Sequence, residues 1–258
     1  MNPIKILFFD IDGTLIDPAT KKISPKTQDA LHRLHEKGFL ICIATGRTPA
    51  SLPDLSGLPI DAFATVNGSL CYTETETIFR NPIPAEAVAK VIQNVTALGR
   101  PVSLALRDRL VANGVEKDLA DYYSLAGLTL TASDDFVEAC KEDVYQIMMG
   151  CREKDHPAII RGAKGVKIAV SWDRAVDVIV DGNGKGDGVQ KILEFFRLDP
   201  SQAVAFGDSY NDLDMFQAVG TTVAMGNAAD ALKAIASHVC GHVSEDGIYH
   251  YCLSQGWI

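Results

Sequence analysis

Short runs of mostly apolar residues constrain the fold of this chain more than any other feature of its sequence. Each run is only a few residues long, and polar loops and amphipathic helical patterns separate one run from the next. The runs lie at residues 4–9, 40–44, 62–66, 203–206 and 222–225. The apolar residues in these runs are continuous and do not alternate with polar ones, which is typical of parallel strands covered on both faces. The pattern therefore predicts an α/β fold built around a parallel sheet.

Amphipathic helices between these runs support the same fold. Ser24 and Pro25 are typical of a helix start, and Gly38 is typical of a helix end. The apolar residues between them recur at helical spacing and would face a sheet. A second helix is predicted after Gly188.

The middle of the chain follows a different pattern, in which a helix and two strands occur twice. The first set is a helix at 84–98 with strands at 102–106 and 110–113, and the second is a helix at 154–163 with strands at 166–171 and 175–180. Helices near 116–126 and 134–141 and a strand at 144–149 lie between the two sets. We expect one antiparallel sheet with helices on a single face. The predicted domains are a core of residues 1–81 and 182–258 and an insert of residues 82–181.

Composition narrows the classes of partner. The 258 residues carry a net charge of -9, which argues against nucleic acid or an anionic membrane as the main partner. The six cysteines form no C-x-x-C pair, and the sequence contains neither a signal-peptide pattern nor an apolar stretch long enough to span a membrane. A cytoplasmic protein is the simplest expectation. An acidic protein that binds phosphate would need a metal ion or a well-placed lysine.

Two carboxylates directly follow the first apolar run. Asp10 and Asp12 stand at the end of what should be a buried strand. Ionised carboxylates at such a position cost desolvation free energy unless a cation or hydrogen-bond donors receive them. Gly13 permits a sharp turn that would direct the backbone amides around Ile11 toward an anion. A plain turn is the alternative explanation, because Asp-Gly is a common turn dipeptide.

A second acidic cluster follows the apolar run 203–206. Asp208 comes two residues after this run, and Asp212 lies where the first turn of the next helix is expected. Asp212 could simply cap that helix, since an acid there complements the helix dipole. Asp208 should lie beside the first two carboxylates, because the carboxyl ends of parallel strands meet at one edge of a sheet. Such a group of acids needs a divalent cation, and a few oxygen ligands shared with a phosphate suit Mg²⁺.

Two further loops offer groups that bind phosphate. Thr45, which follows the run 40–44, supplies a hydroxyl, and Gly46 supplies an amide that a ligand can approach closely. Lys185 stands between glycines just before a predicted helix, where a mobile ammonium and a helix N-terminus would both favour an anion. Alone, Lys185 would be interpreted as an exposed loop residue, but its occurrence with the acidic clusters favours a functional role.

Taken in order, these clusters resemble a known family. They are Asp10-Ile11-Asp12-Gly13-Thr14, Thr45-Gly46-Arg47, Lys185 and Gly207-Asp208-Ser209-Tyr210-Asn211-Asp212. They are similar to motifs I to IV of the haloacid dehalogenase (HAD) superfamily. The insert resembles the type IIB cap of Cof-type phosphatases, and residues 244–248 resemble the end of that subfamily. The resemblance covers essentially the whole chain. One departure is the glycine-rich segment 182–184, because more varied residues are expected before the motif III lysine.

This resemblance implies a fold and a reaction. The fold would be a Rossmann-like parallel-sheet core with an inserted α+β cap that sets substrate choice. The reaction would be Mg²⁺-dependent hydrolysis of phosphate monoesters of small metabolites, such as sugar phosphates, through an aspartyl phosphate. Asp10 would be the nucleophile, and Asp12 would protonate the leaving oxygen and then activate water.

The resemblance also assigns the remaining site residues. Mg²⁺ would be held by Asp10, the backbone carbonyl of Asp12 and Asp208, with Asp212 in support. The groups expected to bind the phosphoryl oxygens are the amides of Ile11 and Gly46 and the side chains of Thr45, Lys185 and Asn211. Arg47 is a candidate for contact with the substrate or the cap, and equally for a structural ion pair.

Other interpretations of these loops fit the spacing poorly. The first cluster lacks the glycine position and the glutamate of an EF-hand, and the segment around Lys185 lacks the Ser or Thr of a P-loop. The glycines between 182 and 188 do not form the G-x-G-x-x-G of a dinucleotide site. Residues 238–242, with two His and one Cys, are interpreted as a last strand and are assigned no role.

Two rival functions share the same loops. A phosphomutase or phosphotransferase would pass the aspartyl phosphate to a second acceptor instead of water. A receiver-like signalling module would use the phosphorylated aspartate as a switch, but the long insert and the acid–base group of Asp12 disfavour it. The sequence indicates neither the substrate nor the oligomeric state.

Overall fold

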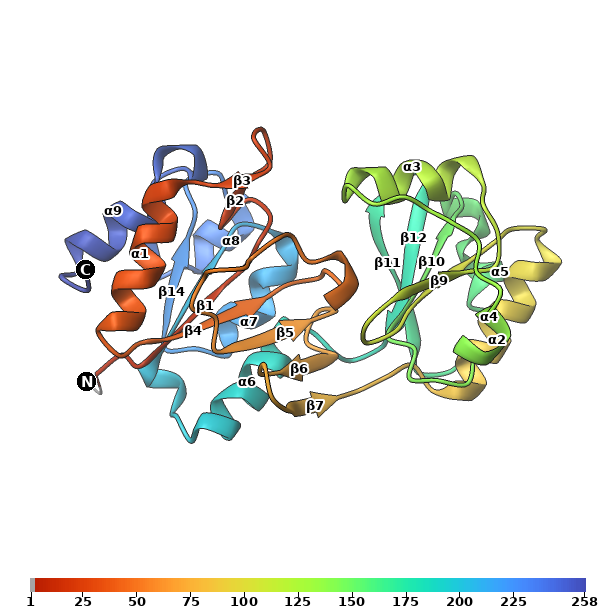
Figure 1. Cartoon of the computed structure of the whole chain (residues 1–258), viewed down its shortest axis with the longest axis horizontal. Helices are drawn as coiled ribbons and strands as arrows, with labels where there is room; N and C mark the ends of the chain where they lie inside the picture. The colour runs from red at the N-terminus through yellow and green to blue at the C-terminus, as the bar shows by residue number, and fades with distance from the viewer. Residues whose placement is uncertain (1–2) are drawn as a thin grey trace. The chain divides into compact units, whose positions relative to one another are not determined.

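The chain forms two compact units, described by a computed structural model over residues 3–258 (Figure 1). The core unit consists of the residues up to Gly46, Asp54–Arg80 and Gly184–Ile258, and the insert unit consists of Arg47–Pro53 and Asn81–Asn183. The sequence prediction assigns Arg47–Pro53 to the core, whereas the structure groups it with the insert. This segment is a turn closed by its own hydrogen bonds, such as the one from the Thr48 N–H to Ser51 Oγ.

A large sheet forms the centre of the core unit, with the strand order β15-β14-β13-β1-β4-β5-β6-β7. Its parallel strands are β1 (Ile6–Phe9), β4 (Leu40–Ala44), β5 (Ala62–Thr65), β13 (Ala203–Gly207), β14 (Thr221–Ala224) and β15 (His238–Val239). Two antiparallel strands, β6 (Leu70–Tyr72) and β7 (Thr77–Arg80), extend one edge. The predicted α/β class with a largely parallel sheet is confirmed.

The middle of this sheet determines where the polar loops emerge. β1 lies between β13 and β4, and all of its side chains are fully buried. Phe9 is in register with Phe206 of β13 and with Ile43 of β4. The rings of Phe9 and Phe206 also stack, with centroids 4.8 Å apart. Because the three strands end at the same level, the loops that follow them meet at the carboxyl edge of the sheet.

Helices pack on the core sheet. They are α1 (Pro25–Glu36), α6 (Lys185–Phe196), α7 (Leu213–Gln217), α8 (Asp230–Ile235) and α9 (Gly247–Ser254). The Ser24 hydroxyl accepts the Thr27 N–H at 3.1 Å and so caps α1, as its sequence predicts. α1 packs on β4 beside α9, and α6 packs on β5 to β7 beside α7 (Figure 1). The helix predicted after Gly188 begins earlier, at Lys185.

Short elements complete the core unit. A two-stranded hairpin of β2 (Ile16–Asp17) and β3 (Lys22–Ile23) follows the loop after β1. The 3-10 turns in this unit are η3 (Pro200–Gln202), η4 (Tyr210–Asp212) and η5 (Val243–Glu245). Across residues 3–258, no helix is long and apolar enough to cross a membrane.

The insert unit is built on a five-stranded antiparallel sheet with the order β11-β12-β10-β8-β9. Its strands are β8 (Ser103–Ala105), β9 (Leu110–Ala112), β10 (Gln146–Gly150), β11 (Val166–Trp172) and β12 (Ala175–Val180). Its helices are α2 (Ala85–Ala97), α3 (Lys117–Leu125), α4 (Phe136–Ala139) and α5 (His156–Ile159), and its 3-10 turns are η1 (Pro49–Ser51) and η2 (Glu153–Asp155). The predicted antiparallel sheet is confirmed, whereas α4 and α5 are shorter than the sequence suggests.

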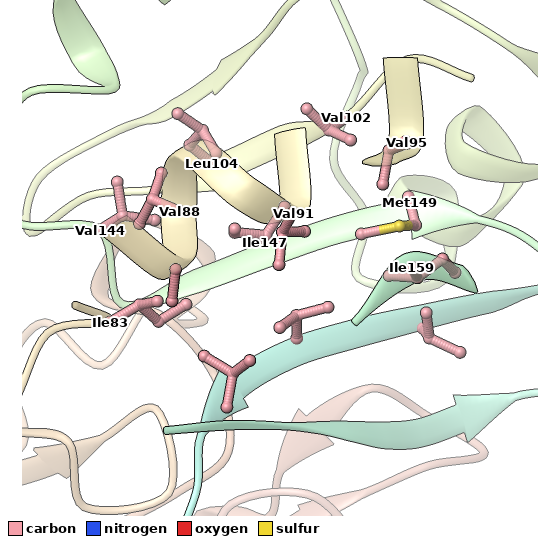
Figure 2. Close-up of a cluster of buried hydrophobic side chains, with 14 of the residues drawn as sticks. Ile83, Val88, Val91, Val95, Val102, Leu104, Val144, Ile147, Met149 and Ile159 are labelled. Carbon is pink, nitrogen blue, oxygen red and sulfur yellow. The ribbon is translucent and has the colours of Figure 1, made fainter. Parts of the chain in front are cut away.

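Helices lie on both faces of the insert sheet, so the expectation of a single covered face is wrong. One face packs against α2, α4 and α5 in a large apolar cluster that includes Leu104 and Ile147 (Figure 2). The neighbouring residues Ala105 and Met148 belong to a second cluster with Leu119 of α3. Successive residues of a strand point to opposite faces, so the two clusters lie on opposite sides of the sheet. α3 therefore covers part of the second face, although it was predicted to share a face with the other helices.

Candidate active site

The loop after β1 gives its two aspartates different environments. Asp10 is only 5% exposed, whereas Asp12 is exposed. The Ile11 carbonyl accepts hydrogen bonds from the N–H groups of Leu15 and the residue after it, which folds the loop back tightly. Gly13 has a φ of +86°, and a Cβ atom at this position would collide with the Asp208 carboxylate. Glycine is therefore required both for the turn and for the close approach of the two loops.

Asp212 organises the loop after β13. This side chain is fully buried. Its Oδ2 accepts hydrogen bonds from the N–H groups of Asp208 at 2.9 Å and Ser209 at 3.0 Å. This oxygen therefore closes the turn η4 at its start, whereas α7, which begins after Asp212, has no side-chain cap hydrogen bond. The neighbouring Asp208 is partly buried, and its Oδ1 accepts the Thr14 hydroxyl at 3.2 Å.

Lys185 joins the two acidic loops. Its Nζ lies 2.6 Å from Asp10 Oδ1 and 2.7 Å from Asp212 Oδ1. The side chain is completely buried, and the residue is the first of α6, after the N-cap Gly184. The sequence suggested a mobile ammonium on a loop, but the structure holds this ammonium between two carboxylates. The difference arises because α6 starts four residues earlier than predicted, at Lys185 instead of after Gly188, and carries Lys185 into the sheet edge.

The carboxylates exceed the available positive charge, and their pKa values reflect this. Burial raises the pKa of Asp10 to about 8, against the attraction of Lys185, and the negative charge of Asp212 adds to the rise. Burial, with a further contribution from Asp212, raises the pKa of Asp208 to about 6. For Lys185, burial disfavours the ammonium, but the carboxylates of Asp10 and Asp212 outweigh it and raise the pKa. The site would therefore accommodate additional positive charge.

A divalent cation fits this cluster. Asp10, Asp208 and Asp212 each offer an oxygen within 4.8 Å of those of the other two. Among the described residues, this is the one group of three His, Cys, Asp or Glu side chains arranged to hold a metal ion. The donors are all carboxylate oxygens, which hard cations such as Mg²⁺ prefer.

The loop after β4 supplies neutral groups beside the acids. Thr45 is buried, and its N–H donates to the Ala64 carbonyl of β5 at 2.8 Å. The Cα of Gly46 faces the Asn67 carboxamide closely enough that a Cβ atom would lie 3.2 Å from Asn67 Oδ1. Asn211, on the loop after β13, donates from Nδ2 to the same Oδ1 at 3.4 Å.

Asn67 is a residue that the sequence interpretation missed. It follows β5, which was recognised as a strand, but no role was assigned to its loop. The Asn67-Gly68 dipeptide at a strand end was the available signal, since it marks a tight turn at the edge where the other loops meet. Asn67 contacts both Gly46 and Asn211, which were themselves predicted site residues.

The predicted site residues do not all lie in one unit. The core unit brings Asp10, Lys185, Asp208 and Asp212 together and contains the other predicted phosphate-binding groups. Arg47 belongs to the insert unit by its contacts, and its Nη1 donates to the Ser51 carbonyl at 2.7 Å. This local hydrogen bond holds the guanidinium against its own turn.

Comparisons with known proteins agree on one family. A family model described as haloacid dehalogenase-like hydrolase matches residues 7–252. The chain is 34% identical over 260 residues to YkrA of Bacillus subtilis (strain 168), a protein named as a phosphatase, with 98% of each chain covered. It is 29% identical over 279 residues to the pyridoxal phosphate phosphatase YbhA of Escherichia coli (strain K12), with 97% of this chain and 98% of that protein covered.

A solved structure extends the agreement to three dimensions. The sugar phosphatase BT4131, described as a member of HAD subclass IIB, superposes with a TM-score of 0.85 at 30% identity, covering 98% of this chain and all of that one. The insert with its antiparallel sheet is included in that match. The predicted resemblance to subclass IIB is thereby confirmed, and the chain belongs to the haloacid dehalogenase-like hydrolases.

Proposed function

We propose that this hydrolase is a Mg²⁺-dependent phosphatase that removes phosphate from small phosphorylated metabolites through an aspartyl phosphate on Asp10. The observation that carries the proposal is the convergence of Asp10, Asp208 and Asp212 around the buried Lys185 ammonium. A carboxylate nucleophile needs a fixed orientation and a site that tolerates a phosphate dianion. The Lys185 ammonium fixes the orientation of the carboxylate. Together with a divalent cation, it also provides the positive charge that lets the site bind a phosphate dianion.

Asp10 is the proposed nucleophile. The Lys185 ammonium holds its Oδ1, and burial shields the carboxylate from bulk water. An Asp10 oxygen forms a bond to phosphorus while the bond from phosphorus to the leaving oxygen breaks, and the electron pair departs with that oxygen. Attack of water on the aspartyl phosphate then releases inorganic phosphate and restores the Asp10 carboxylate.

Asp12 is the proposed acid and base. It stands two residues beyond the nucleophile and is exposed, so it can reach a leaving group and exchange protons with water. It donates a proton to the leaving oxygen in the first step. In the second step it accepts a proton from the attacking water, so the two steps together leave its protonation unchanged.

The cluster of acids is the proposed Mg²⁺ site. Asp10, the Asp12 backbone carbonyl and Asp208 would hold the ion. Asp212 would support it indirectly, because its two oxygens already bind Lys185 and the backbone N–H groups of Asp208 and Ser209. When bound, Mg²⁺ neutralises the charge of the phosphoryl group and of the surrounding carboxylates.

The remaining loops would bind the phosphoryl oxygens and the rest of the substrate. We assign the phosphoryl oxygens to the amides of Ile11 and Gly46 and to the side chains of Thr45, Lys185 and Asn211. The insert unit would select the leaving group, as such inserted units do by closing over a site. The relatives are named for pyridoxal phosphate and for sugar phosphates, so small phosphorylated metabolites of this size are the substrate class we propose.

A phosphate-release screen tests the proposal. The protein is incubated with many phosphorylated metabolites, with Mg²⁺ or with EDTA, and Asp10→Asn serves as the inactive control. We expect phosphate release that requires Mg²⁺ and is lost in Asp10→Asn, while Asp29→Asn, an exposed aspartate of α1, keeps full activity. Release that persists in Asp10→Asn would overturn the mechanism. Substrate isomerisation without net phosphate release would indicate a phosphotransferase instead.

A further inference from the structure

The loop after β5 is held in an unusual backbone conformation. Val66, Asn67 and Gly68 follow one another with φ values of +51°, +50° and +83°. Glycine adopts this left-handed region without strain and asparagine tolerates it, but a β-branched residue such as valine rarely does. Val66 is also fully buried, so the residues packed around its side chain restrict any change in its backbone conformation. Strain of this kind persists where the surroundings fix the backbone, and it concentrates at functional sites.

The strained backbone brings this loop against the helix that carries Lys185. A Cβ atom on Gly68 would collide with the Gly184 carbonyl and the Gly188 N–H. The loop therefore lies directly on the first turn of α6. Any displacement of the loop would also disturb the start of that helix.

Asn67 connects two further loops of the site through its backbone and its side chain. Its backbone N–H donates to the Thr45 carbonyl at 3.0 Å, and its carboxamide lies over the Cα of Gly46. Its Oδ1 accepts from Asn211 Nδ2 at 3.4 Å. The Asn211 amide nitrogen carries two hydrogens, so a hydrogen bond to Asn67 fixes the plane of the carboxamide while the second hydrogen stays available to an anion.

We propose that Asn67 is a positioning residue for phosphate binding, which orients the Asn211 carboxamide and braces Gly46 so that both donate to the same phosphoryl group. This inference rests on the proposed phosphatase function. It adds the loop after β5 to the four loops that the sequence motifs identify. It also gives the left-handed backbone at Val66 and Asn67 a purpose, because this backbone places the Asn67 carboxamide beside Gly46 and Asn211.

Substitutions of Asn67 distinguish the contribution of its carboxamide from that of its left-handed backbone. Asn67→Gly keeps the left-handed backbone without strain and removes the carboxamide. Asn67→Asp keeps the shape but places a negative charge beside the bound anion. Arg197→Gly is the matched control, because Arg197 is an exposed left-handed residue (φ +56°) after the opposite end of α6.

The measurement is the affinity for inorganic phosphate in the presence of Mg²⁺, from product inhibition and from calorimetry. We expect Asn67→Gly to weaken phosphate binding about 3- to 10-fold, as for the loss of one or two hydrogen bonds, with no loss of thermal stability. Asn67→Asp should weaken it more, and Arg197→Gly should leave it unchanged. Asn67→Gly should also be made in a protein that already carries Asn211→Ala. There the change in the logarithm of the phosphate dissociation constant should be less than about half of the change in the wild-type background, because the Asn211 side chain that Asn67 orients is gone.

Two results would overturn the positioning role. One is a phosphate affinity of Asn67→Gly that equals that of the wild type. The other is an effect of Asn67→Gly that is the same with and without Asn211. Failure of the underlying function has a different outcome, since the wild-type protein would then neither release phosphate from any substrate in the screen nor bind it.

Discussion

Lys185 and Asp212 show how one buried ion pair can organise three loops. Asp212 uses one oxygen to accept the backbone N–H groups of its own loop and the other to accept the Lys185 ammonium. The same ammonium reaches Asp10 after β1. Buried charges are stable only when they are paired and hydrogen-bonded, so each of these groups depends on the other two. These hydrogen bonds hold the proposed nucleophile in place through protein groups alone.

Replacing Asp10 with Asn should leave the metal-free protein equally or more stable at pH 8. Burial raises the Asp10 pKa to about 8 in the folded state, compared with about 4 in an unfolded chain. A carboxyl with a raised folded-state pKa favours folding at pH values below 4, and this contribution is lost as the pH rises through 8. The Asn variant keeps the neutral form at every pH, so its free energy of unfolding at pH 8 should equal or exceed that of the wild type.

Urea unfolding in EDTA at pH 4 and pH 8 checks this prediction. The advantage of Asp10→Asn should shrink or disappear at pH 4, where the wild-type carboxyl is itself largely neutral. A marked loss of stability at pH 8 would show that the ion pair with Lys185 outweighs the crowding of the carboxylates.

At the scale of elements, close packing explains the glycine-rich start of α6. Cβ atoms at Gly184 and Gly186 would collide with Asp214 of α7, and one at Gly188 would collide with the backbone of Gly68. In the segment 182–184 that departs from the family's usual variety, Gly184 is therefore needed for the contact with α7, whereas Gly182 has nothing within 4 Å of where its Cβ would lie. Gly186 and Gly188, within α6, allow the same helix to lie close to α7 and to the loop after β5, because the distance between packed elements depends on the side chains at their contact.

A pair of glycine substitutions tests this packing. Gly68 and Gly38 have nearly the same φ, at +83° and +85°, but Gly38 has nothing within 4 Å of where its Cβ would lie. Gly38→Ala should cost only the backbone strain of about 1 kcal/mol. Gly68→Ala should cost at least about 2 kcal/mol more, because the loop must also move away from α6. Chemical denaturation of both variants gives the comparison, and equal losses would contradict the packing argument.

The contact of α3 with the insert sheet contains a buried acid. Asp177 of β12 is 8% exposed, and its Oδ2 accepts the hydroxyl of Tyr122 of α3 at 2.9 Å. Its Oδ1 is the one buried side-chain nitrogen or oxygen atom in the described part of the chain that has no hydrogen-bond partner. Burial raises the pKa of Asp177 to about 6, against the stabilising hydrogen bonds of its charged form.

Replacing Asp177 with Asn should therefore stabilise the protein at pH 8. The raised pKa means that the wild-type carboxyl supports folding below pH 4 and loses this contribution as the pH rises through 6. The gain in the free energy of unfolding should be about 2–3 kcal/mol at pH 8 and close to zero at pH 3. Asp173→Asn, an exposed aspartate four residues earlier, should change little at either pH. Thermal unfolding at the two pH values distinguishes these outcomes, and destabilisation of Asp177→Asn at pH 8 would contradict the prediction.

At the scale of the whole molecule, acidic charge and the proposed metal site are linked. The chain has a net charge of -9, and its clustered acids outnumber the buried lysine beside them. Such a cluster raises the free energy of the folded state until a cation binds. Binding to the folded state alone then stabilises the protein by mass action.

Mg²⁺ should accordingly raise the thermal unfolding temperature of the wild-type protein. At 100 times the dissociation constant, the stabilisation should be about 2.7 kcal/mol, and EDTA should reverse it. Asp208→Asn should lose most of the shift, whereas Asp29→Asn should keep it. Differential scanning fluorimetry over a Mg²⁺ titration makes the comparison, and an unchanged shift in Asp208→Asn would place the ion elsewhere.

Much of this fold could be predicted because buried parallel strands are visible as apolar runs. The runs at 40–44 and 203–206 correspond closely to β4 and β13, and the acids and polar residues that follow them mark the carboxyl edge. The antiparallel strands β6 and β7 were not predicted, because β6 is only three residues long and β7 is partly exposed and lacks a continuous apolar pattern. The placement of α3 was also wrong, since the largely apolar pattern of the strands does not reveal which helix covers which face.

The sequence by itself determined which chemical groups the chain carries and the order of the loops that carry them. Strand hydrophobicity and loop polarity are local properties, so Asp10, Thr45, Lys185 and Asp208 could be identified as candidates from their neighbours alone. Only the tertiary structure decided that Lys185 is a buried partner of Asp10 and Asp212, and that Asn67 meets Asn211. These contacts join residues far apart in the chain, and their geometry depends on strand register and on helix packing that no local pattern encodes.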